Sequence, residues 1–367
     1  MLSLFTILLC LLAAFYFIIL IMLMSGLFRL QEGTVRDQPF ITVVIAARNE
    51  EDNIGSCLES LAVQDYPKEK HEIIVVNDRS LDNTAAVIEG FIEKDGRFRL
   101  VDIREKNPDM APKKWALHKG IGQAKGDIIF TTDGDCTVSP GWISSIVRYF
   151  ERNVGLVAGF SPLNRISSSS IFYRWIRLDG LALAGVAAGS FGAGFPLTCN
   201  GRNLAYRKSV YEDVGGFHSI SRFASGDDDL FLHLVRKKTK WKMRYAIDKE
   251  SVVPSRPPSG LKTFFYQRTR HASKGRHYPI PLTLGLLAVY LFNLLLLISL
   301  VFLRFWPLFA LLFGAKALFE LILVWKAARI FHQKSLLQFF PLGVVMHMFY
   351  VVFFGLWGQV GSFKWKE

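Results

Sequence analysis

Two aspartates, Asp133 and Asp135, stand one glycine apart in the segment TTDGDC, directly after the apolar run IIF. Carboxylates this close repel each other unless a positive group lies nearby. A Mg²⁺ or Mn²⁺ ion would satisfy both, because hard divalent cations take oxygen ligands and keep sites open for phosphate oxygens. The alternative is an ordinary turn, since Asp-Gly pairs are common in turns. The pair alone therefore leaves a metal site and a simple turn both open.

The segments around this pair predict the elements that position it. Short apolar, β-branched runs alternate with segments of helical spacing, and we expect Asn49 to cap the first helix. The runs are continuous rather than alternating, which is typical of strands buried on both faces. The sequence therefore predicts an α/β domain with a largely parallel sheet. The predicted strands are residues 41–46, 72–78, 98–103 and 127–135, and the later predicted helices are residues 81–94 and 113–126.

Polar side chains gather where these predicted strands end. Glu50 follows the first strand, Asn77 and Asp78 end the second, and Asp133 and Asp135 end the fourth. Ligands of such sheets bind outside the carboxyl ends of the strands, so we expect the site there. The glycine-rich dinucleotide signature is missing after the first strand, which excludes a Rossmann dehydrogenase but leaves a nucleotide possible.

Both ends of the chain are apolar enough to cross a membrane. Residues 1–28 carry no charge and are long enough for a bilayer span. A cleaved signal peptide is the alternative, but no basic residue precedes the apolar run. Residues 279–303, 305–325 and 336–360 predict two or three further spans. In the middle one, Lys316 and Glu320 are four residues apart and would pair on one helix face.

The net charge of +13 is concentrated beside these spans. No Asp or Glu occurs from residue 251 to residue 319, whereas residues 251–278 hold six Lys and Arg. Basic residues that flank spans mark the cytoplasmic side and face anionic membrane lipids. We therefore expect a multi-pass protein of the cell membrane whose middle region, the predicted α/β domain, is cytoplasmic. Nucleic-acid binding is excluded as the reason for the charge, because the cluster adjoins a span and no nucleic-acid motif is present.

Two segments have the composition of a membrane surface. Residues 261–275 predict an interfacial helix with Phe264 and Phe265 toward lipid and its arginines toward phosphate. Residues 167–195 mix aromatic and basic residues with a Gly/Ala-rich stretch. That stretch is either a surface segment that opens a path for a lipid, or a core helix followed by a glycine-rich loop.

Five motifs in chain order give residues 40–271 a specific resemblance. The segments VVIAARNEEDNI, IIVVNDRSLDNT, DGD, SGDDDLFL and QRTRH resemble the opening strand, the D-x-S-x-D-x-T block, the DxD motif, the ED block and the Q-x-x-R-W block of the family 2 glycosyltransferases. Framed by spans, they are similar to membrane-bound members such as polysaccharide synthases, ceramide glucosyltransferase and carotenoid glycosyltransferases. The resemblance implies the GT-A fold, an α/β, Rossmann-like domain, with one N-terminal and two or three C-terminal transmembrane helices.

The resemblance also implies which residues bind the donor, a nucleotide-sugar that would be a UDP-sugar, with a GDP-sugar as the alternative. Asp78 would bind the uridine part, Asp135 would hold Mg²⁺ or Mn²⁺, and Arg270 would bind the diphosphate. Metal and arginine would stabilise the charge that grows on the leaving diphosphate. The remaining implied donor residues are Ala46 and Glu50 beside the base, Lys113 beside base or phosphate, and Asp133 near the sugar-nucleotide.

On the acceptor side the resemblance implies that Asp228 is the general base. A hydroxyl is a poor nucleophile and needs a carboxylate to take its proton. The plain alternative for the acids at residues 227–229 is the start of a helix, where they favour the helix dipole, and both roles are compatible. The residues implied to meet the acceptor are Gly201, Asn203, Asp227 and Gln267.

Two departures from the family pattern bear on the product. His271 stands where the family has a tryptophan, and the chain predicts at most four spans. Both weaken the case for a polymer-making enzyme. Together with the predicted spans, the resemblance implies an inverting, metal-dependent membrane glycosyltransferase with a lipid, glycolipid or membrane-proximal hydroxyl as acceptor. A processive polysaccharide synthase and an inactive nucleotide-sugar sensor or scaffold are the alternatives. The expected domains are an anchor (1–28), a GT-A domain (40–250), an interfacial segment (251–278) and a membrane region (279–360).

Overall fold

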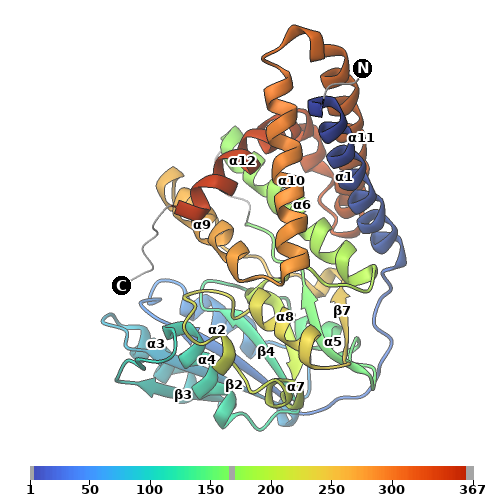
Figure 1. The fold of residues 1–367 in the computed structure, drawn as a ribbon. Coiled ribbons are helices and arrows are strands. Elements are labelled where there is room, and N and C mark those ends of the chain that lie inside the picture. Colours follow the sequence, from blue (N-terminus) through green and yellow to red (C-terminus); the bar gives the residue numbers. More distant parts are fainter. Residues whose placement is uncertain (1–3, 165–169, 361–367) are drawn as a thin grey trace. The chain divides into compact units, whose positions relative to one another are not determined.

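The computed structural model describes residues 4–164 and 170–360 (Figure 1). Tertiary contacts divide the chain into two compact units. The sheet unit comprises the described residues of Leu30–Arg165 and Gly194–Arg256, and the helical unit comprises those of Met1–Arg29, Ile166–Ala193 and Pro257–Glu367. The expected continuous domain of residues 40–250 is therefore interrupted, because the described residues 170–193 belong to the helical unit.

The sheet unit holds a seven-stranded sheet among the described residues, in the order β3-β2-β1-β4-β6-β5-β7. Neighbouring strands are parallel except around β6, which runs antiparallel to both β4 and β5. All four predicted strands are present, and the largely parallel sheet that they imply is confirmed. The strands are β1 (Ile41–Ala47), β2 (His71–Asp78), β3 (Phe98–Ile103), β4 (Ile128–Asp133), β5 (Val154–Gly159), β6 (Leu204–Arg207) and β7 (Lys242–Ala246).

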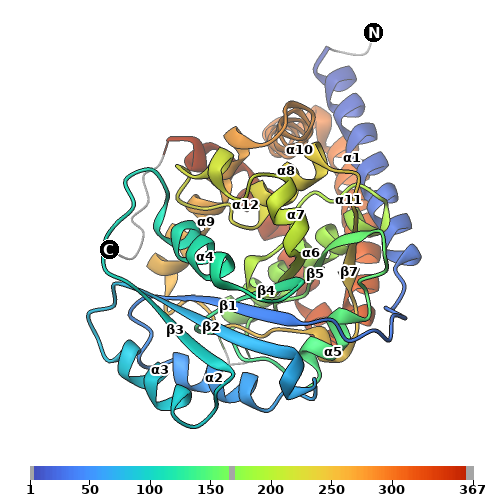
Figure 2. The same ribbon diagram turned by 90° about the horizontal axis from the view of Figure 1, so that it is seen from below.

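Helices cover both faces of the sheet, which explains the continuous apolar runs (Figure 2). Successive strand residues point to opposite faces. Val43 and Ile45 of β1 lie in the core with residues of α2 (Ile54–Ala62), α3 (Thr84–Ile92) and α5 (Trp142–Val147). Val44 points the other way, toward α4 (Pro112–Gln123), where a Cβ on Gly120 would lie 2.5 Å from its Cγ1. Both faces of the strand are therefore covered by apolar side chains.

The loops of the sheet unit correct one expectation. Asn49 does not cap α2; it has φ 51°, and its side-chain oxygen accepts a hydrogen bond from the Leu81 amide at 2.9 Å. Asparagine tolerates this left-handed conformation, so it ties the β1–α2 loop to the β2–α3 loop while α2 begins after Asn53. The other helices are α7 (Lys208–Asp213) and α8 (Asp229–Lys238), with short 3₁₀ turns η1 (Lys68–Lys70), η2 (Gly201–Asn203), η3 (His218–Ile220) and η4 (Lys249–Ser251).

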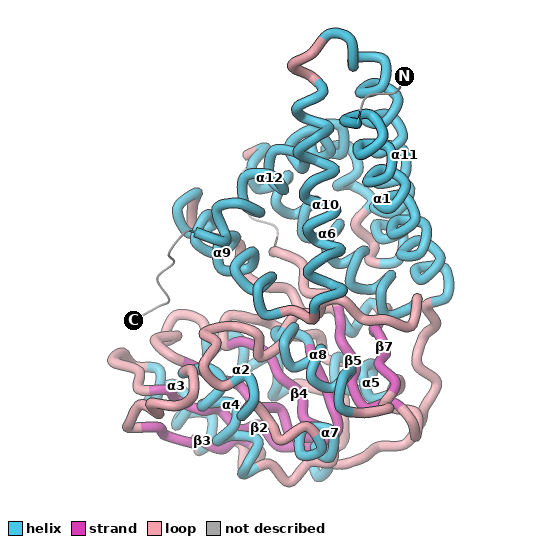
Figure 3. Tube along the Cα trace, viewed as in Figure 1, coloured by secondary structure: helices cyan, strands magenta, loops and turns pink. Residues whose placement is uncertain are grey.

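The helical unit contains the predicted membrane segments (Figure 3). Four stretches are long and apolar enough to cross a membrane, namely residues 4–29, 280–299, 303–330 and 334–359. All three predicted C-terminal spans are therefore helical; residues 1–3 of the predicted anchor lie outside the described residues. The helices are α1 (Leu4–Arg29), α6 (Ile171–Gly192), α9 (Leu261–Ser273), α10 (Ile280–Ser299), α11 (Trp306–Ile330) and α12 (Phe340–Val360), with η5 (Lys274–His277), η6 (Leu303–Phe305) and η7 (Lys334–Phe339).

The segment between β5 and β6 contains a helix, α6, that packs against α1. A Cβ on Gly26 of α1 would lie 1.8 Å from the Gly189 carbonyl oxygen of α6, so the two backbones touch. Only glycine permits so close an approach. The helix of the core-helix alternative is thus confirmed, but the predicted glycine-rich loop is wrong, because α6 continues through the Gly/Ala stretch to Gly192. Residues 167–169 of that prediction lie outside the described residues.

Helix α9 corrects a second expectation. Phe264 is only 6% exposed and packs against Phe172 of α6 at 5.3 Å between ring centroids. Arg268 is also buried, and its Nη2 lies 2.6 Å from Asp179 Oδ2. The prediction that Phe264 faces lipid and Arg268 faces phosphate is wrong, because an apolar helix face packs on protein as readily as on lipid.

Candidate active site

The carboxyl ends of the central strands bring the first predicted residues together. Ala46 of β1 is in register with Asp133 of β4, and Ala47 is in register with Asn77 of β2. Asp78 follows at the end of β2. A Cβ on Gly134 would lie 3.5 Å from the Cγ of Glu50, which places Glu50 beside the same turn. The sheet therefore gathers the predicted donor residues Ala46, Glu50, Asp78 and Asp133 at one edge.

Lys113 joins two acids that are far apart in the sequence. Its Nζ lies 2.8 Å from Asp133 Oδ1 and 3.0 Å from Asp227 Oδ2. Burial alone would lower the pKa of Lys113, but the two carboxylates raise it above its usual value. The lysine is thus held as a cation between the end of β4 and the loop before α8. Its positive charge partly offsets the repulsion between carboxylates that the sequence predicts around Asp133.

Asp135 lies in a region of surplus negative charge. Burial raises the pKa of its carboxyl above the usual value, and Asp133 and Glu50 raise it further, while Arg202 opposes them. Among the described residues no three His, Cys, Asp or Glu side chains are grouped as a metal cage. Such a site fits Mg²⁺ or Mn²⁺ held by one or two carboxylates, since these ions take their other ligands from water and phosphate.

Asp228 stands at the start of α8, as the helix-start alternative expects. Its Oδ1 accepts a hydrogen bond from the Asp229 amide at 2.7 Å, and its Oδ2 accepts one from the Gly201 amide at 3.3 Å. A Cβ on Gly201 would lie 3.0 Å from Asp227 Oδ2, so glycine lets the two segments meet. The predicted base and the predicted acceptor residues Gly201 and Asp227 are therefore neighbours.

Asn203, the other predicted acceptor residue of the same turn, is buried inside the sheet unit. It is fully buried, and its Nδ2 donates to the carbonyl oxygens of Phe160 at 2.9 Å and Ser251 at 2.7 Å. Its Oδ1 accepts from Trp142 Nε1 at 3.1 Å. The expectation that Asn203 meets the acceptor is therefore corrected: its amide holds together the segments that adjoin β5, β6 and β7.

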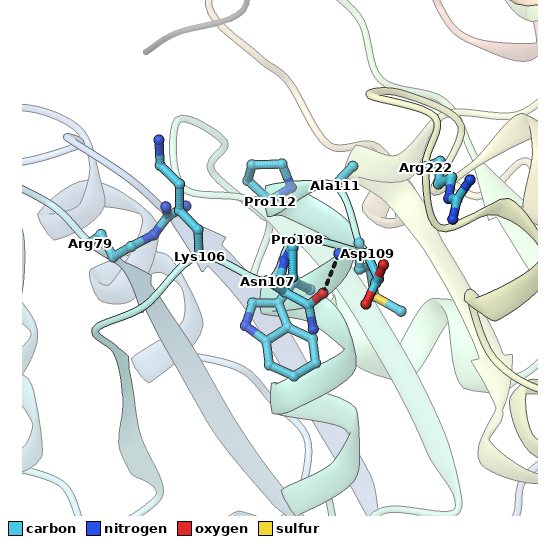
Figure 4. A pocket seen from close by; sticks show the side chains of 10 residues that line it. Arg79, Lys106, Asn107, Pro108, Asp109, Ala111, Pro112 and Arg222 are labelled. Carbon is cyan, nitrogen blue, oxygen red and sulfur yellow. Dashed lines mark hydrogen bonds between the residues drawn. The ribbon is translucent and has the colours of Figure 1, made fainter.

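A pocket that the motifs did not reveal adjoins the end of β2 (Figure 4). It has a volume of about 300 Å³ and is lined by Arg79, Lys106, Arg222 and Trp115, among others. Arg79 has φ 57°, and its Nε lies 2.7 Å from Asp78 Oδ1. Its Nη1 is buried and has no hydrogen-bond partner among the described residues. The sequence signal for this pocket was an arginine directly after Asp78, at the strand end.

Two predicted residues lie in the other unit. Gln267 and Arg270 belong to α9, in the helical unit. Their predicted contacts with acceptor and diphosphate stay predictions.

Comparison with known proteins shows what the domain that carries most of this site is similar to. The profile described as glycosyl transferase family 2 matches residues 42–215. A probable glycosyltransferase, YdaM, of Bacillus subtilis is 28% identical over 252 residues, which cover 67% of this chain and 57% of that protein. The beta-monoglucosyldiacylglycerol synthase of Synechocystis is 25% identical over 245 residues, covering 65% of this chain and 48% of that protein. The chain thus spans about half the length of these relatives.

A solved structure extends the likeness of fold along nearly the whole chain. The mannosyltransferase PcManGT of Pyrobaculum calidifontis, solved with GDP-Man and Mn²⁺, has a TM-score of 0.60 at 20% identity. The alignment covers 97% of this chain and 100% of that one. At this identity the likeness establishes the fold, and the predicted GT-A architecture is confirmed.

Proposed function

We propose that this chain, whose residues 42–215 match the family 2 glycosyltransferase profile and whose fold is GT-A, transfers a sugar from a UDP-sugar to a lipid hydroxyl. The observation that carries the proposal is the Lys113 bridge, which joins Asp133 at the end of β4 to Asp227, next to Asp228. It brings the residues for donor and acceptor into one cluster. Their individual roles are part of the proposal.

The donor nucleotide would bind at the carboxyl ends of β1 and β2. Asp78 and the adjoining Arg79 would face the nucleoside, with Trp115 and Lys106 in the neighbouring pocket. The buried Nη1 of Arg79 offers a donor to an oxygen of the ligand. Lys113 would balance part of the charge of the diphosphate, and the family resemblance assigns the same task to Arg270.

The transfer step needs one base and one leaving group. The acceptor oxygen would form a bond to the sugar C1 as the bond from C1 to the diphosphate oxygen breaks, which inverts the anomeric centre. The Asp228 carboxylate would take the acceptor proton, and the electron pair of the broken bond would leave on the diphosphate. The Gly201 amide, which donates to Asp228 Oδ2, would keep that carboxylate oriented.

Asp135 would hold a divalent cation in this reaction. The fit rests on the carboxylates that crowd around it, since Asp133 and Glu50 raise its pKa and Arg202 only opposes them. A bound Mg²⁺ or Mn²⁺ supplies charge stabilisation to the leaving diphosphate. The solved structure of the same fold contains Mn²⁺ with GDP-Man, which supports this assignment and keeps a GDP-sugar as the second donor to test.

The lipid acceptor rests on two observations. Four helices of the described chain are apolar and long enough for a membrane, and one relative is named for making a glucosylated diacylglycerol. A processive synthase is the rival, because a poly-beta-1,6-N-acetyl-D-glucosamine synthase of Staphylococcus epidermidis is 32% identical over 178 residues, 48% of this chain and 41% of that protein. The cytoplasmic placement of the sheet unit belongs to the proposal and follows from the basic residues that flank the spans.

The deciding experiment is a donor screen in membranes that contain extracted lipids. The purified chain is supplied with UDP- and GDP-sugars and Mn²⁺ or Mg²⁺, and nucleotide release and lipid products are measured by mass spectrometry. We expect release with one UDP-sugar and a lipid that gains a single sugar. A ladder of many sugars would favour the processive rival, and nucleotide binding without release from any donor would contradict the proposal.

A further inference from the structure

Lys114 is a buried lysine that the proposed reaction does not use. Only 1% of it is exposed, although its neighbour Lys113 is partly open to solvent. Lysine is rarely buried to this degree unless polar groups surround its ammonium. Its side chain therefore has a defined set of partners inside the sheet unit.

The ammonium of Lys114 binds the loop that carries the proposed catalytic acid. Its Nζ donates to the Phe223 carbonyl oxygen at 2.5 Å and to the Ser225 carbonyl oxygen at 2.8 Å. These carbonyls belong to a non-helical segment, so helical hydrogen bonds do not satisfy them. Just beyond Ser225 the chain reaches Asp227 and then Asp228.

The start of α4 holds this loop through both of its lysines and its backbone. Besides the two bonds of Lys114, the Ala111 amide donates to the Ser221 carbonyl oxygen at 2.8 Å, and Lys113 pairs with Asp227. We call residues 221–228 the acid loop. Its turn is fixed by Gly226, whose φ of 98° suits glycine and where a Cβ would lie 2.5 Å from Leu230 Cγ.

The two lysines at the start of α4 thus act on the acid loop in different ways. Lys113 contacts two carboxylates and stands beside the donor residues. Lys114 donates to two backbone carbonyls, and these bonds set the path of the loop. Losing them would leave two carbonyl groups without these donors and let the loop move.

We infer that Lys114 is a positioning residue, which fixes the acid loop so that Asp228 stays beside the Gly201 amide. This inference rests on the proposed function, in which Asp228 takes the acceptor proton. Misplacement of a reacting group by about 1 Å can cost about a hundredfold in rate. Loss of Lys114 should therefore impair transfer to the acceptor while leaving donor binding intact.

The test compares Lys114→Met with two other lysine variants in the full chain. Lys113→Met removes the bridge itself, and Lys125→Met, an exposed lysine just after α4, is the matched control. For each variant we would measure donor affinity, the rate of transfer to acceptor lipid, and the rate of donor hydrolysis by water. Thermal unfolding is recorded alongside.

We expect Lys114→Met to lower the transfer rate by about tenfold to a hundredfold. Its donor affinity should match the wild type, so the ratio of transfer to hydrolysis falls. Lys113→Met should lose donor affinity, and Lys125→Met should leave all three quantities unchanged. Lys114→Arg, which keeps N–H donors, should recover part of the transfer rate.

Two results would overturn the inference. One is an unchanged ratio of transfer to hydrolysis in Lys114→Met, since a merely structural role lowers both rates together. The other is a loss of donor affinity as large as that of Lys113→Met. If Lys114→Met does not fold, Lys114→Gln, which keeps two N–H donors, is judged by the same criteria. A wild type that uses no donor would instead contradict the proposed function.

Discussion

Two lysine–carboxylate clusters, one in each unit, differ in the number of acids that each lysine contacts. In the helical unit, Lys316 Nζ lies 2.6 Å from Glu320 Oε1, to which the Tyr16 hydroxyl also donates. His347 Nδ1 lies 3.4 Å from the same oxygen. In the sheet unit, Lys113 forms ion pairs with both Asp133 and Asp227. One cluster pairs one lysine with one acid, whereas the other pairs one lysine with two.

The difference separates a structural from a functional cluster. The Glu320 cluster joins α1, α11 and α12, and its lysine and acid balance each other. Around Lys113 the acids Asp135 and Glu50 add to the negative charge, with Arg202 opposing it. Surplus charge of one sign costs stability and is typical of sites that await a ligand. We therefore propose catalysis for the acids of the sheet unit and helix packing for those of the helical unit.

The largest effect is expected from Asp228→Asn. Removing the base should reduce turnover by about 10²- to 10⁴-fold, while donor affinity stays at the wild-type value. Nucleotide release and donor titration would measure the two quantities. Glu212→Gln, an exposed change on α7, is the control and should turn over normally. Normal turnover of Asp228→Asn would remove Asp228 from the mechanism.

The next effect concerns stability in the helical unit. Lys316→Met leaves Glu320 buried without its lysine, which should cost about 3–5 kcal/mol of unfolding free energy. Unfolding in detergent would measure it, and Lys316→Met with Glu320→Gln should recover much of the loss. Lys326→Met is the matched control, because that lysine lies over the Phe28 ring. A Lys316→Met variant as stable as the wild type would contradict a structural role for the Glu320 cluster.

Asp135→Asn should stabilise the folded protein, whereas Lys316→Met should destabilise it. The folded-state pKa of Asp135 is raised, so its ionised form costs stability above that pKa, and the cost disappears below the unfolded-state value of about 3.9. Without metal, Asp135→Asn should therefore unfold at a higher temperature than the wild type near neutral pH. The difference should shrink as the pH falls. A variant that is less stable at neutral pH would contradict the surplus of negative charge.

The smallest effect is expected from Arg202→Met, which removes the cation that opposes the raised pKa of Asp135. The pH below which metal-dependent donor binding is lost should rise slightly, since Arg202 is partly exposed and solvent screens its charge. Donor titrations at several pH values would measure the shift. A shift to lower pH would show that Arg202 does not act on Asp135.

Local spacing in the sequence was enough to predict several parts of the fold. The strand before Asp133 is a continuous apolar run, and a parallel sheet places its end beside those of neighbouring parallel strands, as the register of β1 with β4 confirms. The pairing of Lys316 with Glu320 also follows from helical spacing, and it is confirmed.

Other features depend on partners that local sequence does not identify. The motif order implied Lys113 and Asp227 separately, but their contact joins distant parts of the chain and appears only in the fold. The apolar face of α9 predicts burial of Phe264 without distinguishing protein from lipid. The buried position of Lys114 likewise comes from the path of the acid loop, and the segment KKWALH does not by itself predict which of its two lysines is buried.

The most direct test of the charge comparison is a Mn²⁺ titration, followed by electron paramagnetic resonance in the presence of UDP. We predict that the wild type and Glu320→Gln bind Mn²⁺ alike, and that Asp135→Asn loses this binding. Equal Mn²⁺ binding by Asp135→Asn and the wild type would contradict this, because the surplus acids of the sheet unit would then not be what holds the cation.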